Sequence, residues 1–376
     1  MDFPQDMSKA CFAFRGYDVK NLGRTPELLA VPEYRPFLLA PLAEASQECT
    51  VTLGKPVDLI GMIDAGEDFE LEHYGEALAM IVAIEQGQLS VLRECHGIDT
   101  GRAAFNFGFS LGEISALVAG GTFELADALR IPLALTPDCI ELARDVTLGI
   151  VFSRREALNI KRIQNMMVEI NALDQGVIGM STHISPNSML VMGTGNTISV
   201  LKERIKAEFS KDTKLRCNDY HWPPLHTPIV WEKDLNSRTG RMLHTIPGAF
   251  TKPSPNILSL LTGEMSYDDF NTREHMTRWV DHPQKLWDVV CAVLHSDVQA
   301  VIHAGPTPNI FPATFDRLTK NIETQISANR GVKALSTVIE RPWLKKLLPK
   351  DAGLLRAPKL RHIILEDWLI ENAPQS

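Results

Sequence analysis

The sequence has 376 residues, of which 44% are hydrophobic and 22% are charged, and its formal net charge is −8. This composition is typical of a globular protein and argues against disorder or a fibrous structure. The net negative charge gives no general reason to bind nucleic acid, and no apolar run reaches the roughly 20 residues of a membrane-spanning helix. We therefore expect no nucleic-acid or membrane partner. The length suits one large domain with a smaller one, or two ordinary domains.

The N-terminal segment and the cysteines both favour a cytoplasmic protein. Residues 1–15 contain two acidic side chains and no long apolar stretch, unlike a signal peptide. The six cysteines are scattered and form no CxxC pair, which argues against a zinc ribbon and against a dense disulfide framework. We expect free thiols, no bound metal and a cytoplasmic location.

In chain order, helical and strand-like stretches alternate, which favours an α/β fold with a mainly parallel sheet. Residues 77–93 have helical spacing and mostly good helix formers. Residues 102–109 form a short apolar and aromatic run that predicts a buried strand, and residues 112–119 return to helical composition. The predicted order at this point is strand, sharp turn, helix.

Further along, two predicted strands (176–181 and 188–193) flank a polar turn over residues 183–187. An amphipathic helix is predicted over residues 198–209, so residues 165–222 favour a small α+β unit. A last strand is predicted over residues 298–303, before a turn-rich stretch.

The segment from residue 320 to residue 376 is locally basic, with ten Lys and Arg against six Asp and Glu. Two interpretations remain open. The positive charge can meet an acidic carrier protein, or it can belong to a solvated surface helix, as such charge runs commonly do.

Residues 108–112 read Gly-Phe-Ser-Leu-Gly, a G-x-S-x-G pattern between a predicted strand and a predicted helix. In a nucleophile elbow the serine sits on a strained turn, and small neighbours let the backbone pack closely around it. The next backbone N–H, that of Leu111, then lies where an oxyanion would form. Chance is the competing explanation of so short a pattern. The flanking strand and helix favour Ser110 as a nucleophile.

The longer stretch GFSLGEISALVAGGTFELADALR, residues 108–130, resembles malonyl-CoA:acyl-carrier-protein transacylases and polyketide acyltransferase domains. Further similar segments follow in the same order, so that the resemblance covers roughly residues 77–315: ISPNSMLVMGTGNTISVLKERI, PPLHTPIV, KPSPNILSLLTGE, DHPQKLW and HAGPTPNI. The resemblance implies an α/β-hydrolase-like large domain over residues 1–164 and 223–376, with residues 320–376 as a C-terminal extension. It also implies an inserted, ferredoxin-like small domain over residues 165–222.

The resemblance also implies a catalytic pair. His226, in PPLHTPIV, matches the family's histidine, which would take the proton of Ser110 because a serine at its free pKa is a weak nucleophile. In this family a backbone carbonyl orients the histidine, and the matching position here is His282. The second oxyanion donor would be the backbone N–H of Tyr17. Another histidine can serve instead, the alternatives being His183, His221 and His303.

For the substrate, the family uses an arginine, whose planar fork pairs with the carboxylate of a malonyl group. The nearest matches are Arg155, which we favour, and Arg154; both can equally be solvated surface side chains. Phe109 stands where the family has a histidine, and a phenyl ring offers no conventional donor to a carboxylate. This weakens the expected preference for malonyl and favours an uncharged acyl chain. Leu225, before His226, leaves specificity open.

The resulting expectation is an acyltransferase of fatty acid or polyketide biosynthesis. It would move a malonyl or related acyl group from coenzyme A to an acyl carrier protein through an acyl-serine, with no cofactor. Two alternatives remain open: a thioester hydrolase that uses the same serine and histidine, and a non-catalytic protein that binds carrier protein or acyl-CoA.

Overall fold

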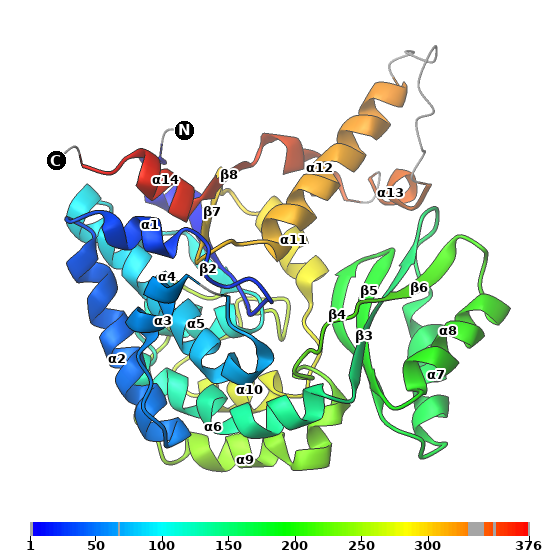
Figure 1. Ribbon diagram of the computed structural model, residues 1–376. Helices are drawn as coiled ribbons and strands as arrows, with labels where there is room; N and C mark the ends of the chain where they lie inside the picture. The colour runs from blue at the N-terminus through cyan, green and yellow to red at the C-terminus, as the bar shows by residue number, and fades with distance from the viewer. Residues whose placement is uncertain (1–2, 67, 330–341, 349–350, 375–376) are drawn as a thin grey trace.

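Two separate four-stranded sheets organise the chain (Figure 1). The computed structural model describes residues 3–66, 68–329, 342–348 and 351–374. One sheet is parallel with the strand order β2-β1-β7-β8, and the other is antiparallel with the order β4-β5-β3-β6. The predicted α/β class, with a large parallel-sheet domain and a small α+β domain, is confirmed.

The strands are β1 (Ala10–Phe14), β2 (Phe105–Gly108), β3 (Val146–Ser153), β4 (Ile178–Ser185), β5 (Ser188–Thr194), β6 (Thr213–Cys217), β7 (Ala300–Ala304) and β8 (Arg361–Ile364). The helices are α1 (Thr25–Ala30), α2 (Arg35–Leu53), α3 (Leu59–Ala65), α4 (Tyr74–His96), α5 (Leu111–Ala119), α6 (Leu125–Ala143), α7 (Ile160–Asn171), α8 (Thr197–Glu208), α9 (Leu235–Leu243), α10 (Thr272–Trp279), α11 (Leu286–His295), α12 (Ile310–Asn329), α13 (Pro342–Leu347) and α14 (Leu365–Glu371). The helices predicted around residues 77–93, 112–119 and 198–209 correspond to α4, α5 and α8.

The parallel sheet is buried on both faces, as parallel sheets usually are. Successive side chains of a strand point to opposite faces, so β1 divides its five buried residues between two cores. Phe12 and Phe14 pack into the core formed with α2, α4, α5 and α6, whereas Cys11 and Ala13 pack into the core formed with α11 and α12. This arrangement fixes the sheet between two helical layers.

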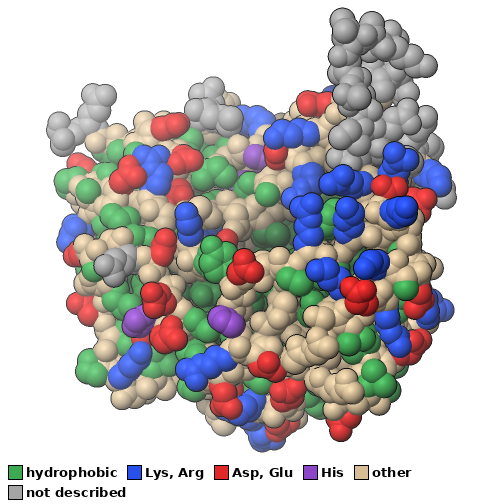
Figure 2. Space-filling view, turned by 45° about the vertical axis from the view of Figure 1, so that its right-hand side comes forward, with side chains coloured by type: hydrophobic (Ala, Val, Ile, Leu, Met, Phe, Trp, Pro, Cys, Tyr) green, Lys and Arg blue, Asp and Glu red, His purple; other side chains and the backbone are tan. Residues whose placement is uncertain are grey.

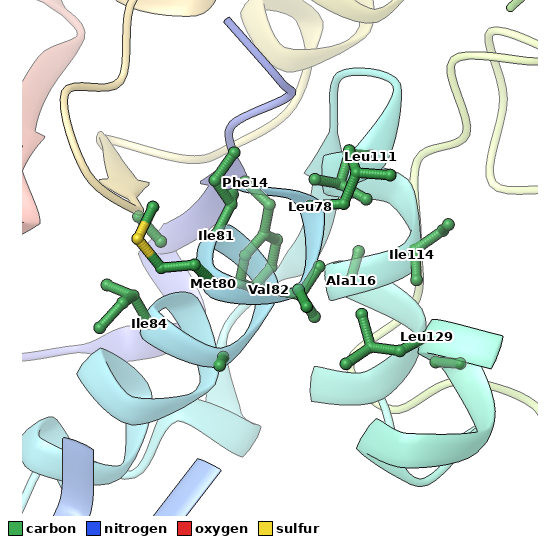
Figure 3. Close-up of a cluster of buried hydrophobic side chains, with 14 of the residues drawn as sticks. Phe14, Leu78, Met80, Ile81, Val82, Ile84, Leu111, Ile114, Ala116 and Leu129 are labelled. Carbon is green, nitrogen blue, oxygen red and sulfur yellow. The ribbon is translucent and has the colours of Figure 1, made fainter. Parts of the chain in front are cut away.

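Helix α4 is buried along most of its length, and its residues 77–84 are apolar on every side because they lie inside the first of these cores. Figure 3 shows Ile81 and Val82 of α4 beside Phe14 of β1. Ala116 of α5 lies next to Val82, on the side away from Phe14. Helix α5 follows β2 directly and contacts α4, β1 and β2, and these contacts hold the strand–turn–helix segment at residues 108–112 in place.

The antiparallel sheet has the connectivity β3-α7-β4-β5-α8-β6, and its spatial order places β3 and β5 in the centre. This is the ferredoxin-like arrangement, and Figure 1 shows it to the right of the parallel sheet. The predicted boundary at residue 165 was wrong, because β3 already belongs to this sheet and starts at Val146. The predicted turn over residues 183–187 is also shorter, since β4 continues to Ser185.

The two faces of the antiparallel sheet have different neighbours. Val151 of β3 and Val191 of β5 face the core formed with α7 and α8. The alternate residues, including Leu148 of β3 and Leu190 of β5, point to the other face and pack toward the large domain. This second face forms one wall of the cleft described below.

The segment after residue 320 is part of the large domain and not a simple extension of it. Helix α12 runs through that boundary, and β8 pairs with β7 at the edge of the parallel sheet. Residues 330–341 and 349–350 of the basic segment lie outside the described residues. In the part of the chain that the structure describes, no helix is long and apolar enough to cross a membrane.

Candidate active site

Ser110 lies on a strained turn between β2 and α5. Its backbone has φ 52° and ψ −115°, a region that L-residues rarely occupy and that costs about 1–3 kcal/mol. The two glycines of the G-x-S-x-G pattern make the turn possible. A Cβ atom on Gly108 would lie 2.0 Å from the carbonyl carbon of Gly112, and one on Gly112 would lie 2.3 Å from the carbonyl oxygen of Phe14. The predicted strand–turn–helix geometry is therefore present.

His226 is the histidine that meets Ser110. The Oγ atom of Ser110 lies 2.7 Å from Nε2 of His226, and Nδ1 of His226 lies 2.7 Å from the carbonyl oxygen of Trp279. The indole N–H of Trp279 also donates to the carbonyl oxygen of Ser110 at 3.1 Å. The orienting carbonyl therefore belongs to Trp279 and not to His282 as predicted. The helix α10 ends at Trp279, so its last carbonyls have no partner within the helix.

The surroundings of His226 suit a general base. Burial lowers the pKa of His226 to about 4, an effect that the hydrogen bond to the Trp279 carbonyl only partly opposes. The ring is therefore neutral at pH 7. Since Nδ1–H donates to the carbonyl, the lone pair of Nε2 is free to accept the proton of Ser110.

Two of the other three candidate histidines have side-chain partners elsewhere. Nδ1 of His221 lies 3.2 Å from the carbonyl oxygen of Ala143, and Nε2 of His303 lies 3.0 Å from Nδ1 of His362 within the parallel sheet. His183 lies on β4, where its backbone N–H donates to the carbonyl of Gln284.

The sequence did not predict any role for Gln284, which is fully buried between Ser110 and His226. Its Oε1 atom accepts the backbone N–H of Ser110 at 3.3 Å, and its Nε2 atom lies 3.2 Å from Nδ1 of His226. Its backbone pairs with β4, donating to Ser181 and accepting from His183. A polar residue directly after Pro283 in the DHPQKLW segment was the only sign of it in the sequence.

The resemblance expects the backbone N–H groups of Leu111 and Tyr17 as oxyanion donors. Leu111 is the first residue of α5, so its N–H is not used by the helix. The loop that carries Tyr17 packs on the elbow, since a Cβ atom on Gly16 would lie 2.7 Å from the carbonyl oxygen of Phe109. The buried guanidinium of Arg15 holds this loop by donating to the carbonyl oxygens of Gly16 and Lys20. Whether both groups act in catalysis stays a prediction.

A cavity of about 160 Å³ opens above Ser110, and we call it the serine cavity. It is lined by Phe109, Ser110, Leu225 and His226, by the loop at residues 16–18, by the cleft face of the antiparallel sheet and by the start of α12. A smaller space of about 10 Å³, the inner recess, lies beside Ser110 and is lined by residues of α4 and α6. The serine cavity therefore brings together five of the predicted site residues: Tyr17, Phe109, Ser110, Leu225 and His226.

Arg154 and Arg155 do not line the serine cavity. They line a larger hollow of about 810 Å³, which we call the arginine groove, together with Arg216 and Arg317. The side chain of Arg155 is 70% exposed and lies 3.6 Å from Asp212. The length of β3 explains why these arginines are far from Ser110. Leu148 of β3 lines the serine cavity, whereas the two arginines follow Ser153, which lies about 16 Å further along the strand.

The serine cavity and the arginine groove follow one another along the same elements. On β3, Leu148 lines the cavity and Phe152 lines the groove; on α12, Ile310 lines the cavity and Arg317 lines the groove. Figure 2 shows lysine and arginine side chains gathered on the side of the molecule that carries the antiparallel sheet. The lining of the cleft therefore contains no lysine or arginine near Ser110 and several arginines at its far end.

Comparisons with known proteins agree with the fold. No protein-family profile matches the sequence, and no curated protein sequence matches it. Among solved structures, FabD from Acinetobacter baumannii is similar with a TM-score of 0.65 and 16% identity, over 93% of this chain and 99% of that one. MCAT from Streptococcus pneumoniae is similar with a TM-score of 0.67 and 19% identity, over 81% and 91%.

The chain has the fold of the malonyl-CoA:acyl carrier protein transacylases. The acyltransferase domain from module 8 of the salinomycin polyketide synthase shares this fold too, with a TM-score of 0.65 and 19% identity over 82% of this chain and 67% of that domain. The resemblance seen in the sequence is thus confirmed at the level of the transacylase fold. Among the described residues, no group of three or more His, Cys, Asp or Glu side chains is placed to hold a metal ion.

Proposed function

We propose that this protein is an acyltransferase that moves an acyl group from a coenzyme A thioester to the phosphopantetheine thiol of a carrier protein. The observation that carries the proposal is the contact of 2.7 Å between Ser110 Oγ and a buried, neutral His226 on a nucleophile elbow. Nucleophile, base and orienting carbonyl are all within hydrogen-bond distance, which is the arrangement needed for covalent catalysis.

In the first half-reaction, Ser110 Oγ attacks the thioester carbonyl carbon while its proton passes to Nε2 of His226. The imidazolium keeps its Nδ1–H bond to the Trp279 carbonyl. The N–H groups of Leu111 and Tyr17 stabilise the oxyanion. When the tetrahedral intermediate collapses, the C–S bond breaks and the coenzyme A thiolate takes the proton from His226.

In the second half-reaction, the carrier-protein thiol gives its proton to His226 and attacks the acyl-serine carbonyl. Collapse of the second intermediate breaks the ester bond and returns the proton to Ser110 Oγ. The enzyme is regenerated, and no net proton or electron is gained or lost.

The arginine groove supports a phosphopantetheine substrate. From Ile310 to Arg317, α12 rises about 10 Å, so the groove begins within the reach of an extended pantetheine arm whose thioester lies at Ser110. Arginine is well suited to phosphate, which both coenzyme A and a carrier-protein arm contain.

Proteins with the same fold support a carrier protein as the acceptor. One solved structure of this fold is a malonyl-transacylase in complex with a type II polyketide acyl-carrier protein, at a TM-score of 0.63 and 18% identity over 81% of this chain and 92% of that one.

The first test is the intact mass of the protein after brief incubation with acyl-CoAs. We expect an adduct of one acyl group, and we expect Ser110→Ala to lose it and to lower transfer at least about 10³-fold. The matched control is Ser266→Ala, because Ser266 is another serine hydroxyl bonded to a histidine, 3.0 Å from His275. Ser266→Ala should keep the adduct.

Three results would contradict the proposal in different ways. An adduct that persists in Ser110→Ala means that another residue is the nucleophile. An adduct that decays to free acid without an acceptor thiol means that the protein is a hydrolase. No adduct and no released coenzyme A with any thioester means that the protein only binds its ligand.

A further inference from the structure

The space around the proposed acyl-serine is apolar. The lining of the inner recess includes the aliphatic side chains of Leu78, Pro132, Leu135 and Leu225, of which Leu225 also lines the serine cavity. All four side chains are buried. An acyl group on Ser110 would therefore contact hydrocarbon on most sides.

Charged groups are nearly missing from this lining. Among the described residues that line the serine cavity and the inner recess, none is a lysine or an arginine. Burial raises the pKa of Tyr17 to about 12 and that of Cys139 to about 12, so both are neutral near pH 7. The carboxyl group in the lining is that of Asp18, which would repel a second carboxylate.

The nearby arginine on the N-terminal loop is already engaged. Besides the carbonyl oxygens of Gly16 and Lys20, the guanidinium of Arg15 donates to Pro306 and to Oδ1 of Asn21. Arg15 lines neither the serine cavity nor the inner recess, and Arg154 and Arg155 lie in the arginine groove. Arg15 would have to break these hydrogen bonds to reach the acyl group.

We propose that the acyl group carried by Ser110 is short and uncharged and is not a malonyl-type carboxylate. The inference rests on the proposed function and names the substrate class of that same site. A carboxylate buried without a cation loses its hydration and gains no partner, whereas a hydrocarbon chain of the same size gains from leaving water. The serine cavity, at about 160 Å³, and the inner recess, at about 10 Å³, together leave room for a short acyl chain.

The test compares two thioesters whose acyl groups have the same number of heavy atoms, isovaleryl-CoA and malonyl-CoA. The isovaleryl group has two methyl groups where the malonyl group has its two carboxylate oxygens. We expect isovaleryl-CoA to acylate the wild-type protein at least about 100-fold faster, measured by intact mass against time. Equal or faster acylation by malonyl-CoA overturns this inference but leaves the acyltransferase standing. The absence of acylation by any thioester overturns the proposed function itself.

A pair of variants at Leu225 tests the physical cause. Leu225→Lys places a cation beside the cavity, while Leu225→Met keeps a side chain of similar length without charge. We expect the Lys variant to reduce the preference for isovaleryl-CoA at least about tenfold and the Met variant to retain it. A folded Lys variant with the wild-type preference overturns the inference. If this variant does not fold, the comparison of thioesters on the wild-type protein still decides.

Discussion

The amide of Gln284 touches both catalytic partners, and its backbone pairs with β4 of the ferredoxin-like domain. By accepting the N–H of Ser110, the side chain supports the strained elbow. By lying against Nδ1 of His226, it limits the rotation of the ring. Gln284 is therefore a positioning residue, since it acts through Ser110 and His226 and not on the substrate.

We expect Gln284→Met to lower kcat for acyl transfer about 10- to 100-fold while KM for the thioester changes less than about twofold. The reason is that the variant loosens the reacting pair without altering the lining of the cleft. Steady-state kinetics measures this split between kcat and KM. Gln325→Met, at another buried glutamine, is the control. A lower melting temperature with unchanged kcat would show that Gln284 has only a structural role.

At the scale of single elements, the edge of the parallel sheet contains a pair of histidines, of which one is buried and the other half-buried. His303 on β7 and His362 on β8 stack with ring centroids 5.3 Å apart. Burial lowers the pKa of His362 to about 4 and holds that of His303 well below its usual value. Both rings are neutral in the folded protein, so protonation opposes the pairing of β8 with β7.

This pair makes stability depend on pH with a defined sign. A histidine whose pKa is lowered by folding contributes stability that is present above the unfolded pKa of about 6.5 and is lost as pH falls toward the folded pKa. For His362 this amounts to about 3 kcal/mol between pH 7 and pH 4. We expect urea unfolding of His362→Phe to show a weaker pH dependence by about that amount.

The control for this experiment is His244→Phe, because His244 is exposed and its replacement should leave the pH dependence unchanged. If His362→Phe and the wild-type protein lose equal stability between pH 7 and pH 4, the histidine pair is not the source of the acid sensitivity.

The elements that the sequence predicted well are those whose pattern is local. Helix α4 shows helical spacing over residues 77–93, and the turn at Ser110 is encoded within five residues. Strand β3 was assigned to the wrong unit and β8 was not predicted as a strand, because strand pairing depends on partners far away in the chain. Periodicity alone does not name those partners.

In the candidate active site, too, local patterns were predicted well and long-range contacts were not. Ser110 and His226 lie in segments with a local resemblance, and the structure brings them together. Gln284 and the carbonyl of Trp279 reach them only through the packing of distant loops. Arg155 was misplaced because its neighbours in sequence do not reveal that β3 carries it away from Ser110.

At the scale of the whole molecule, the cleft separates the acyl end from the phosphate end of the proposed substrate. We expect Arg216→Ala and Arg317→Ala to raise KM for acyl-CoA about 3- to 30-fold, because each removes a cation from the arginine groove. The increase should shrink at high salt. Steady-state kinetics with acyl-CoA and with an acyl N-acetylcysteamine thioester, which has no phosphate, measures the effect.

The N-acetylcysteamine thioester should be insensitive to both substitutions. Arg241→Ala, on the exposed side of α9, is the control variant and should change neither KM. An equal rise of KM for both thioesters would mean that the groove arginines act on the structure of the cleft and not on phosphate.

The parallel sheet is assembled from remote parts of the chain, with β1 between β2 and β7 and with β8 beyond β7. During synthesis, β1 leaves the ribosome long before β7 and β8, which complete one side of the sheet, have been made. The ferredoxin-like unit needs only residues 146–217, so it can collapse while the apolar segments of α4 and β1 still await β7 and β8. We expect the nascent large domain to be a client of chaperones, whereas the inserted domain matures unaided.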